Sequence, residues 1–188
     1  MMRRILAAAV VAFGGLSGSV AFAQNMTLTS AEVADGATIK DAQVANVFGC
    51  KGGNVSPSLT WSGAPSDTKS FAVTVYDPDA PTGSGFWHWV VFNIPASTTS
   101  IPLGAGDMKK KLMPKGAIQS RTDFGTDGYG GPCPPQGDKP HHYIFTVYAV
   151  DEDKLQFAKD HNVSAAVVGF ELHFHSKAKA SLTATYGR

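Results

Sequence analysis

Short runs of apolar residues recur along the chain, and each is bounded by Gly, Pro, Asn or Asp. Such runs, when rich in β-branched and aromatic residues, are typical of β-strands. Three nearly continuous runs, at 71–76, 90–94 and 144–150, predict central strands that are covered on both faces. The segment 177–186 alternates Lys, Ser and Thr with Ala, Leu and Tyr, which predicts a strand with one buried face. We therefore predict strands at Met26–Thr29, Thr38–Lys40, Leu59–Ser62, Ser70–Tyr76, His88–Ile94, Tyr143–Val150 and Lys177–Tyr186.

Helical patterns are scarce. Residues 151–159 have room for one or two helical turns, and Ser164 is a suitable N-cap for a helix that continues to about His175. In that helix Val167, Phe170 and Phe174 form one apolar stripe. The pair His173 and His175 has a spacing found in some metal motifs. Residues two apart on a helix do not share a face, so we expect no metal ligation by this pair.

The pattern as a whole predicts a mainly β fold. Many short strands are separated by Gly- and Pro-rich loops, and the chain has no internal repeat and no low-complexity tract. These features indicate a single domain of the β-sandwich type.

The first residues have the composition of a secretory signal peptide. A basic start at Arg3 and Arg4 precedes the apolar segment 5–16, and Ala21-Phe22-Ala23 is a suitable cleavage site. A membrane anchor is the alternative, but the apolar segment is too short for a bilayer core of about 30 Å. We predict a signal peptide at 1–23, a domain at 24–188 without a transmembrane segment, and a periplasmic or secreted location.

The charge of the chain argues against nucleic acid as a partner. The formal net charge is +1, and removal of Arg3 and Arg4 with the signal peptide would make it negative, whereas nucleic-acid binding needs a concentrated basic face. The one basic cluster, Lys109-Lys110-Lys111 with Lys115, is typical of a solvated loop. We expect no cofactor, and the sequence does not indicate an oligomeric state.

The two cysteines allow one intramolecular disulfide, between Cys50 and Cys133. Disulfides form in the oxidising compartments that exported proteins reach. Both residues lie in Gly- or Pro-rich loops, where a bridge is easily placed. Two separate buried thiols are the alternative.

Two stretches gather groups that suit chemistry. The strand at 71–76 leads into Asp77-Pro78-Asp79-Ala80-Pro81, which is followed by Trp87-His88-Trp89. The second stretch is Gly130-Gly131-Pro132-Cys133-Pro134-Pro135, followed by His141-His142-Tyr143. Each couples a loop made rigid or unusual in geometry by Gly and Pro to a histidine at the start of a strand. The two stretches together predict a small polar pocket.

These blocks resemble the signature blocks of the phosphatidylethanolamine-binding protein family, and in particular its bacterial, Raf-kinase-inhibitor-like branch. Asn54-Val55-Ser56-Pro57 and the terminal Thr185-Tyr186-Gly187-Arg188 extend the resemblance, which covers roughly Phe48 to Arg188. The resemblance implies a large central antiparallel sheet, a smaller sheet on one face and a few peripheral helices, one of them near the C-terminus.

The resemblance also implies a ligand site. A phosphoryl group needs donors fixed in advance, such as a tyrosine hydroxyl, histidines and backbone N–H groups in a Gly-rich loop, while an aspartate can orient a histidine or accept from an ammonium group. The site carried over by position consists of Asp77, Asp79, Pro81, His88, Gly130, Gly131, Pro135, His141 and Tyr143. We expect a small phosphorylated or anionic ligand, such as a phospholipid head group.

Other functions fit the same residues. Histidines at strand ends and Asp-Pro pairs often serve structure alone. An inhibitor or modulator of a protease or other protein partner would use the same rim. An enzyme could use His88, His141 and Asp77 as a two-histidine, one-carboxylate metal site, but no ligand spacing such as H-E-x-x-H supports it. A serine hydrolase would need a nucleophile beside a base, and the mature chain has no G-x-S-x-G motif. Cys133 is the best nucleophile, and a disulfide would silence it, so we do not expect an enzyme.

Overall fold

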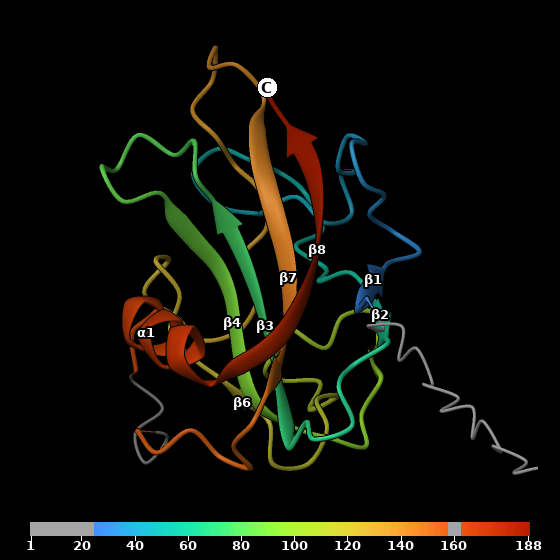
Figure 1. Cartoon of the computed structure of the whole chain (residues 1–188). Coiled ribbons are helices and arrows are strands. Elements are labelled where there is room, and N and C mark those ends of the chain that lie inside the picture. Colours follow the sequence, from blue (N-terminus) through green and yellow to red (C-terminus); the bar gives the residue numbers. More distant parts are fainter. Residues whose placement is uncertain (1–24, 158–162) are drawn as a thin grey trace, which may run out of the picture.

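The computed structural model describes residues 25–157 and 163–188, and within them it contains eight strands and one helix (Figure 1). The predicted signal peptide at 1–23 lies outside the described residues. The strands are β1 (Thr27–Thr29), β2 (Leu59–Ser62), β3 (Ser70–Asp77), β4 (Phe86–Pro95), β5 (Ser100–Ile101), β6 (Ile118–Gln119), β7 (His141–Val150) and β8 (Ser176–Tyr186), and the helix is α1 (Ala165–His175).

The strands form two antiparallel sheets, in the orders β6-β4-β3-β7-β8 and β1-β2-β5. The predicted fold class, mainly β with a large central sheet, a smaller sheet and a helix near the C-terminus, is thus confirmed. No helix in the part of the chain described here has the length and apolar character needed to cross a membrane.

The nearly continuous apolar runs became the three central strands of the large sheet, β4, β3 and β7. Their side chains alternate between two cores because successive residues of a strand point to opposite faces. One face, which includes Val73 and Val75, packs with the small sheet, where Trp61 meets Phe71 at 5.3 Å between ring centroids. The other face packs against α1. Figure 1 shows α1 and the small sheet on opposite sides of the large sheet.

The helix begins where its predicted cap lies. Ser164 has extended backbone angles, and its hydroxyl accepts a hydrogen bond from the Val167 N–H. The apolar stripe, however, faces outward: Val167, Phe170 and Phe174 are 45%, 62% and 63% exposed. The buried residues Ala165, Val168 and Leu172 lie on a different stripe against Val90 and Phe92. The smaller side chains allow α1 to approach the sheet closely, so the larger aromatic rings remain outside.

Two predicted elements are absent from the structure. Residues 38–40 make only a single parallel bridge, Thr38 to Thr185, because a turn begins at Asp41 and leaves no length for a ladder. Residues 151–157 form bends and turns instead of a helix, and the rest of that predicted element, 158–159, lies outside the described residues. The alternating strand at 177–186 is confirmed as β8, although most of its side chains are only partly buried.

Candidate ligand-binding site

The predicted polar groups meet at one end of the large sheet. In an antiparallel sheet the end of β3 lies beside the starts of β4 and β7, so Asp77, His88, His141 and Tyr143 come together. They form the floor of a cavity of about 210 Å³. Its wall consists of Phe48, Ala80, Pro81, Thr82, Phe86, Phe124, Cys133, Pro134 and Pro135. Six of the nine predicted site residues therefore line one cavity: Asp77, Pro81, His88, Pro135, His141 and Tyr143.

A β-bulge turns His88 toward this cavity. Val75 of β3 is opposite Trp89, but the next residue, Tyr76, is opposite Trp87, so His88 has no partner on β3. The extra residue lets His88 and Trp89 both face the side of the sheet that carries the cavity and the main core, whereas strict alternation would place them on opposite sides. The His88 ring packs edge-on against Tyr143 at 5.1 Å.

Asp77 connects the loop to the second histidine. Its Oδ1 accepts hydrogen bonds from the N–H groups of Asp79, at 2.8 Å, and Ala80, at 3.1 Å. Its Oδ2 accepts from Nδ1 of His141 at 2.8 Å, and both side chains are buried. The other ring nitrogen of His141, Nε2, lies 3.5 Å from the carboxylate of Asp138. The carboxylate of Asp77 thus fixes the orientation of the His141 ring.

His88 is held in a different way. Its Nδ1 lies 2.8 Å from the carbonyl oxygen of Gly130, a contact in which the ring must donate because a carbonyl can only accept. Burial lowers the pKa of His88, and this effect outweighs the contact with Gly130 and the nearby charge of Asp77. A neutral His88 with its proton on Nδ1 leaves Nε2 as a hydrogen-bond acceptor.

The Tyr143 hydroxyl is buried in the cavity without a partner. Tyr143 is 1% exposed, and its oxygen makes no hydrogen bond of regular geometry to any of the described residues, although it interacts with the nearby carboxylate of Asp77. Burial, together with the adjacent carboxylate of Asp77, raises the pKa of Tyr143, so the group remains protonated and can donate. A buried hydroxyl without a partner costs about 1–3 kcal/mol.

Gly130 and Gly131 support the cavity but do not line it. The N–H of Gly130 donates to the carbonyl of His88 at 2.9 Å, and the N–H of Gly131 donates to Oδ1 of Asn54 at 2.8 Å. Neither N–H remains available for an anion. A Cβ at Gly130 would lie 2.2 Å from the ring of Phe124, and one at Gly131 would lie 2.1 Å from the Gln43 carbonyl oxygen. Glycine is therefore needed at both positions, because the loop backbone lies directly against Phe124 and Gln43.

Asp79 also points away from the cavity. Its Oδ2 accepts from both the backbone N–H and Nδ1 of His142, each at 2.7 Å. These hydrogen bonds, the backbone one first, lower the pKa of Asp79. Because His142 faces the opposite side of β7 from His141 and Tyr143, Asp79 fixes the loop rather than the cavity floor.

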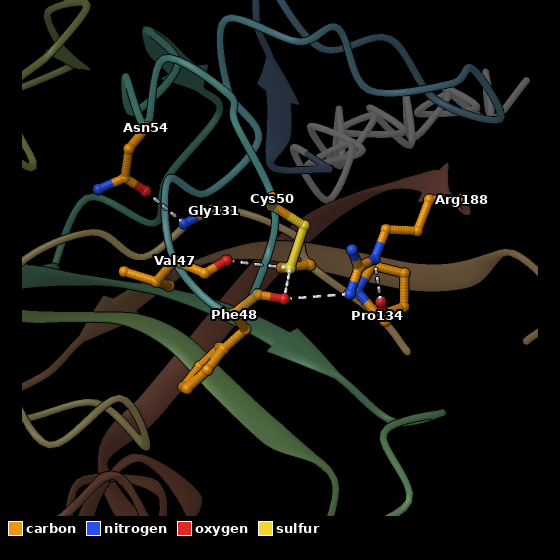
Figure 2. The surroundings of a disulfide bond; sticks show 8 residues. Val47, Phe48, Cys50, Asn54, Gly131, Pro134 and Arg188 are labelled. Atoms are coloured by element: carbon orange, nitrogen blue, oxygen red, sulfur yellow. Dashed lines mark hydrogen bonds between the residues drawn. A yellow bond between two sulfur atoms is a disulfide. The ribbon is translucent and has the colours of Figure 1, made fainter. Parts of the chain in front are cut away.

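A disulfide connects two loops of the cavity wall (Figure 2). Cys50 and Cys133 are bonded, which confirms the predicted pairing, and neither is a free thiol. Arg188 joins the same loops: its Nε donates to the Pro134 carbonyl at 2.7 Å and its Nη2 to the Phe48 carbonyl at 3.2 Å. The disulfide and the guanidinium group together hold Phe48 beside Pro134.

The apolar half of the cavity was not predicted. Phe48, Phe86 and Phe124 lie in three separate segments, and no motif connects them. Phe124 is in contact with both others, at 5.9 Å from Phe48 and 4.9 Å from Phe86 between ring centroids. The only sequence signal for this apolar wall was the position of Phe86, two residues before His88. That signal is ambiguous, because the β-bulge that turns His88 toward the cavity is not visible in the sequence.

Comparison with known proteins gives the family. The model of the phosphatidylethanolamine-binding protein family matches residues 29–187. The chain belongs to this family. It is 50% identical to the Escherichia coli protein YbcL over 185 residues, covering 98% of both chains, and 50% identical to E. coli YbhB over 161 residues, covering 86% of this chain and 99% of YbhB.

Solved structures of family members have the same fold. The crystal structure of E. coli YbcL, described as a new member of the mammalian family, has a TM-score of 0.84 at 52% identity and covers 87% of this chain and 99% of YbcL. A family homologue from Chlamydia trachomatis has a TM-score of 0.72 at 30% identity and covers 88% of this chain and 99% of its own. The two solved structures are described as family members, and none of the names of these relatives states an enzymatic activity.

Proposed function

We propose that this member of the phosphatidylethanolamine-binding protein family is an exported protein that binds a small amphiphilic ligand with a phosphoryl head group in the cavity beside Tyr143. The observation that carries the proposal is the buried Tyr143 hydroxyl without a partner. A phosphoryl oxygen that accepted from it would remove the cost of an unpaired buried donor. This oxygen would lie between the Tyr143 hydroxyl and Nε2 of His141, which can donate to it when His141 binds the ligand as an imidazolium, because Nδ1 already donates to Asp77.

His88 supports a ligand head group that also carries a hydrogen-bond donor. Neutral His88 presents Nε2 as an acceptor, which suits an ammonium or hydroxyl group and not a bare phosphoryl oxygen. A head group that carries both a phosphoryl oxygen and an ammonium would satisfy Tyr143 and His88 together. An ethanolamine phosphodiester has both groups.

The wall of the cavity supports an apolar substituent on that ligand. Phe86, Phe124, Pro134 and Pro135 line it, and Phe48, which is 70% exposed, lies at its edge. Aromatic and proline side chains carry no positive charge that could bind a second anionic group. Burial of an alkyl or acyl chain against them is favourable, because it removes apolar surface from water. Free inorganic phosphate would leave this wall unused.

The geometry supports binding better than hydrolysis. Among the residues that line the cavity, Cys133 is held in the disulfide and the Thr82 hydroxyl donates to the Gly85 carbonyl. Neither is presented to a base as a nucleophile must be. The alternative of a protein inhibitor that uses the same rim stays a prediction.

Calorimetric titration tests the proposal. We expect a water-soluble ethanolamine phosphodiester with a short acyl chain to bind more tightly than inorganic phosphate, without being consumed. His141→Ala and His88→Ala should each weaken binding, by about 1.5–3 kcal/mol where a charged hydrogen bond is lost. Asp79→Asn is the matched control, because its carboxylate contacts His142 outside the cavity. Release of a cleaved product would favour the hydrolase, and equal binding in all variants would reject the site.

Export is the other half of the proposal. A disulfide is compatible with an oxidising compartment, and it therefore supports export. N-terminal analysis of protein from the periplasmic fraction should give Gln24 as the first residue. Retention of Met1 in that fraction would contradict the signal peptide.

A further inference from the structure

A second group of ligand-type side chains lies at the other end of β7, where α1 meets β8. Asp151 and Glu152 directly follow β7, and His175 is the last residue of α1. One possible ligand atom from each of these three residues lies within 4.8 Å of the others, and all three are partly exposed. We propose that Asp151, Glu152 and His175 bind a divalent zinc-like ion.

The distance between His175 and Asp151 fits this ion. Nδ1 of His175 lies 3.1 Å from Oδ1 of Asp151. Zinc bonds to nitrogen and oxygen are about 2.0–2.2 Å long, so two ligand atoms of a tetrahedral ion are roughly 3.3 Å apart. An ion can therefore replace the proton in the hydrogen bond between His175 and Asp151 with little movement of these two side chains. The displaced proton passes to solvent. The Glu152 carboxylate has an oxygen within 4.8 Å of the other two ligand atoms, and it moves closer to become the third ligand, while water takes the fourth position.

The surroundings of His175 favour metal binding through Nδ1. With Nδ1 on the metal, the ring proton is on Nε2, which lies 3.6 Å from Oε2 of Glu171. A carboxylate at the second nitrogen is the usual outer partner of a metal-bound histidine, because it fixes the tautomer and the ring orientation. Glu171 is therefore a positioning residue in this proposal.

The backbone adds a negative potential at the same place. His175 ends α1, and the aligned peptide dipoles of a helix give its C-terminus a partial negative charge that favours cations. The N–H of Asp151 donates to the His175 carbonyl at 3.0 Å, which holds the two ligand residues together independently of their side chains. The three ligands thus belong to a fixed junction between β7 and α1.

Lys177 occupies the far side of Asp151. Its Nζ lies 3.2 Å from Oδ2, while Oδ1 faces His175. The lysine therefore leaves one carboxylate oxygen for the ion but places a positive charge nearby. Removal of this charge should strengthen metal binding, whereas a purely structural ion-pair network would give no such gain.

The mixed ligand set decides the class of metal. Imidazole and carboxylate together suit zinc and other transition metals such as nickel and copper, whereas calcium and magnesium prefer oxygen ligands alone. The bound ion would connect the end of β7 to the end of α1 and the start of β8. We therefore expect it to stabilise this part of the fold.

The test is calorimetric titration of zinc chloride into the untagged full chain after chelation and dialysis. We expect one ion per chain, and a zinc-dependent rise of the unfolding temperature. His175→Ala and Glu152→Gln should each weaken zinc binding at least tenfold. His173→Ala, on the same helix but outside the cluster, is the matched control and should keep the parent affinity. His142→Ala removes a second His–Asp pair of the described residues, His142 with Asp79, and should also have no effect.

Lys177→Gln completes the test, since it should bind zinc more tightly than the parent. Equal zinc affinity in the parent and Glu152→Gln would overturn the proposal even if His175→Ala failed to fold. Loss of binding in His142→Ala would overturn it by placing the ion at Asp79. Calcium binding as tight as zinc binding would overturn the proposed metal class.

Discussion

At the scale of single residues, the site depends on which atoms already have partners. Asp77 uses Oδ1 for the loop and Oδ2 for His141, so its charge is committed to positioning. His88 uses Nδ1 for Gly130. The Tyr143 hydroxyl is the one of these groups that the fold leaves without a partner among the described residues. We therefore expect a bound ligand to accept a hydrogen bond from Tyr143.

The lowered pKa of His88 gives a prediction for stability against pH. An unfolded histidine has a pKa of about 6.5, and the folded value is lower. As the pH falls below about 6.5, the unfolded chain takes up a proton that the folded chain resists, so the free energy of unfolding decreases until the folded pKa is passed.

Urea unfolding between neutral and mildly acidic pH measures this effect. His88→Gln should lose less stability over this interval than the parent, because it removes one titrating group. The comparison of slopes cancels the contribution of the other histidines. Parallel slopes in the two proteins would contradict a buried neutral His88.

At the scale of elements, the loop around Cys133 has more than one connection to its neighbour. The disulfide joins residues 83 apart in sequence, and closing a loop of that length should stabilise the fold by roughly 4 kcal/mol. The hydrogen bonds of Arg188 and the bond from the Ala45 N–H to the Pro132 carbonyl at 3.0 Å are independent of the sulfur atoms.

The double variant Cys50→Ser/Cys133→Ser should therefore lose stability but keep most of its ligand affinity. We expect affinity within tenfold of the parent at temperatures well below unfolding. Adding Arg188→Ala should then weaken binding further, because Phe48 loses its second connection to Pro134. Denaturant unfolding and calorimetry on both variants measure the two effects. A full loss of binding in the first variant would show that the disulfide alone shapes the cavity.

The outward stripe of α1 gives a second prediction at this scale. Phe170 and Phe174 contact each other at 5.0 Å between ring centroids, but both are mostly exposed. Phe170→Ser should change the free energy of unfolding by less than about 1 kcal/mol, whereas Leu172→Ala, at a position that is 3% exposed, should cost about 2–5 kcal/mol. Thermal or urea unfolding of the two variants and the parent measures these changes in the free energy of unfolding. The reverse order of costs would mean that the helix packs through its aromatic face.

The central strands could be predicted from the sequence, but the orientation of α1 and the bulge in β4 could not. The central strands could be predicted because a strand buried on both faces needs a nearly continuous apolar run, as in residues 71–76. The facing of α1 could not, because Leu172 and Phe174 are both apolar and only the close approach of the helix to the sheet selects the smaller residue. The bulge at His88 and the contacts of Phe124 also depend on tertiary structure, which no local pattern encodes.

At the scale of the whole molecule, the fold places a pocket with a polar floor and an apolar wall at one end of the sheet. The large sheet brings Asp77, His141 and Tyr143 together from segments far apart in sequence, and the disulfide closes the wall. Family membership, shown by the match over residues 29–187, agrees with this architecture. We infer that the cavity is preorganised for a ligand, and that the unpaired Tyr143 hydroxyl lowers the stability of the free protein.

Tyr143→Phe tests this claim most directly, because it removes one oxygen atom and keeps the ring. Binding of an ethanolamine phosphodiester should weaken by about 1–3 kcal/mol, roughly 5- to 150-fold. The free protein should become more stable, since a buried donor without a partner has been removed. Paired calorimetric titration and thermal unfolding of the parent and Tyr143→Phe give both numbers. Weaker binding together with a higher unfolding temperature is the predicted result, and unchanged affinity together with a lower unfolding temperature would contradict the account.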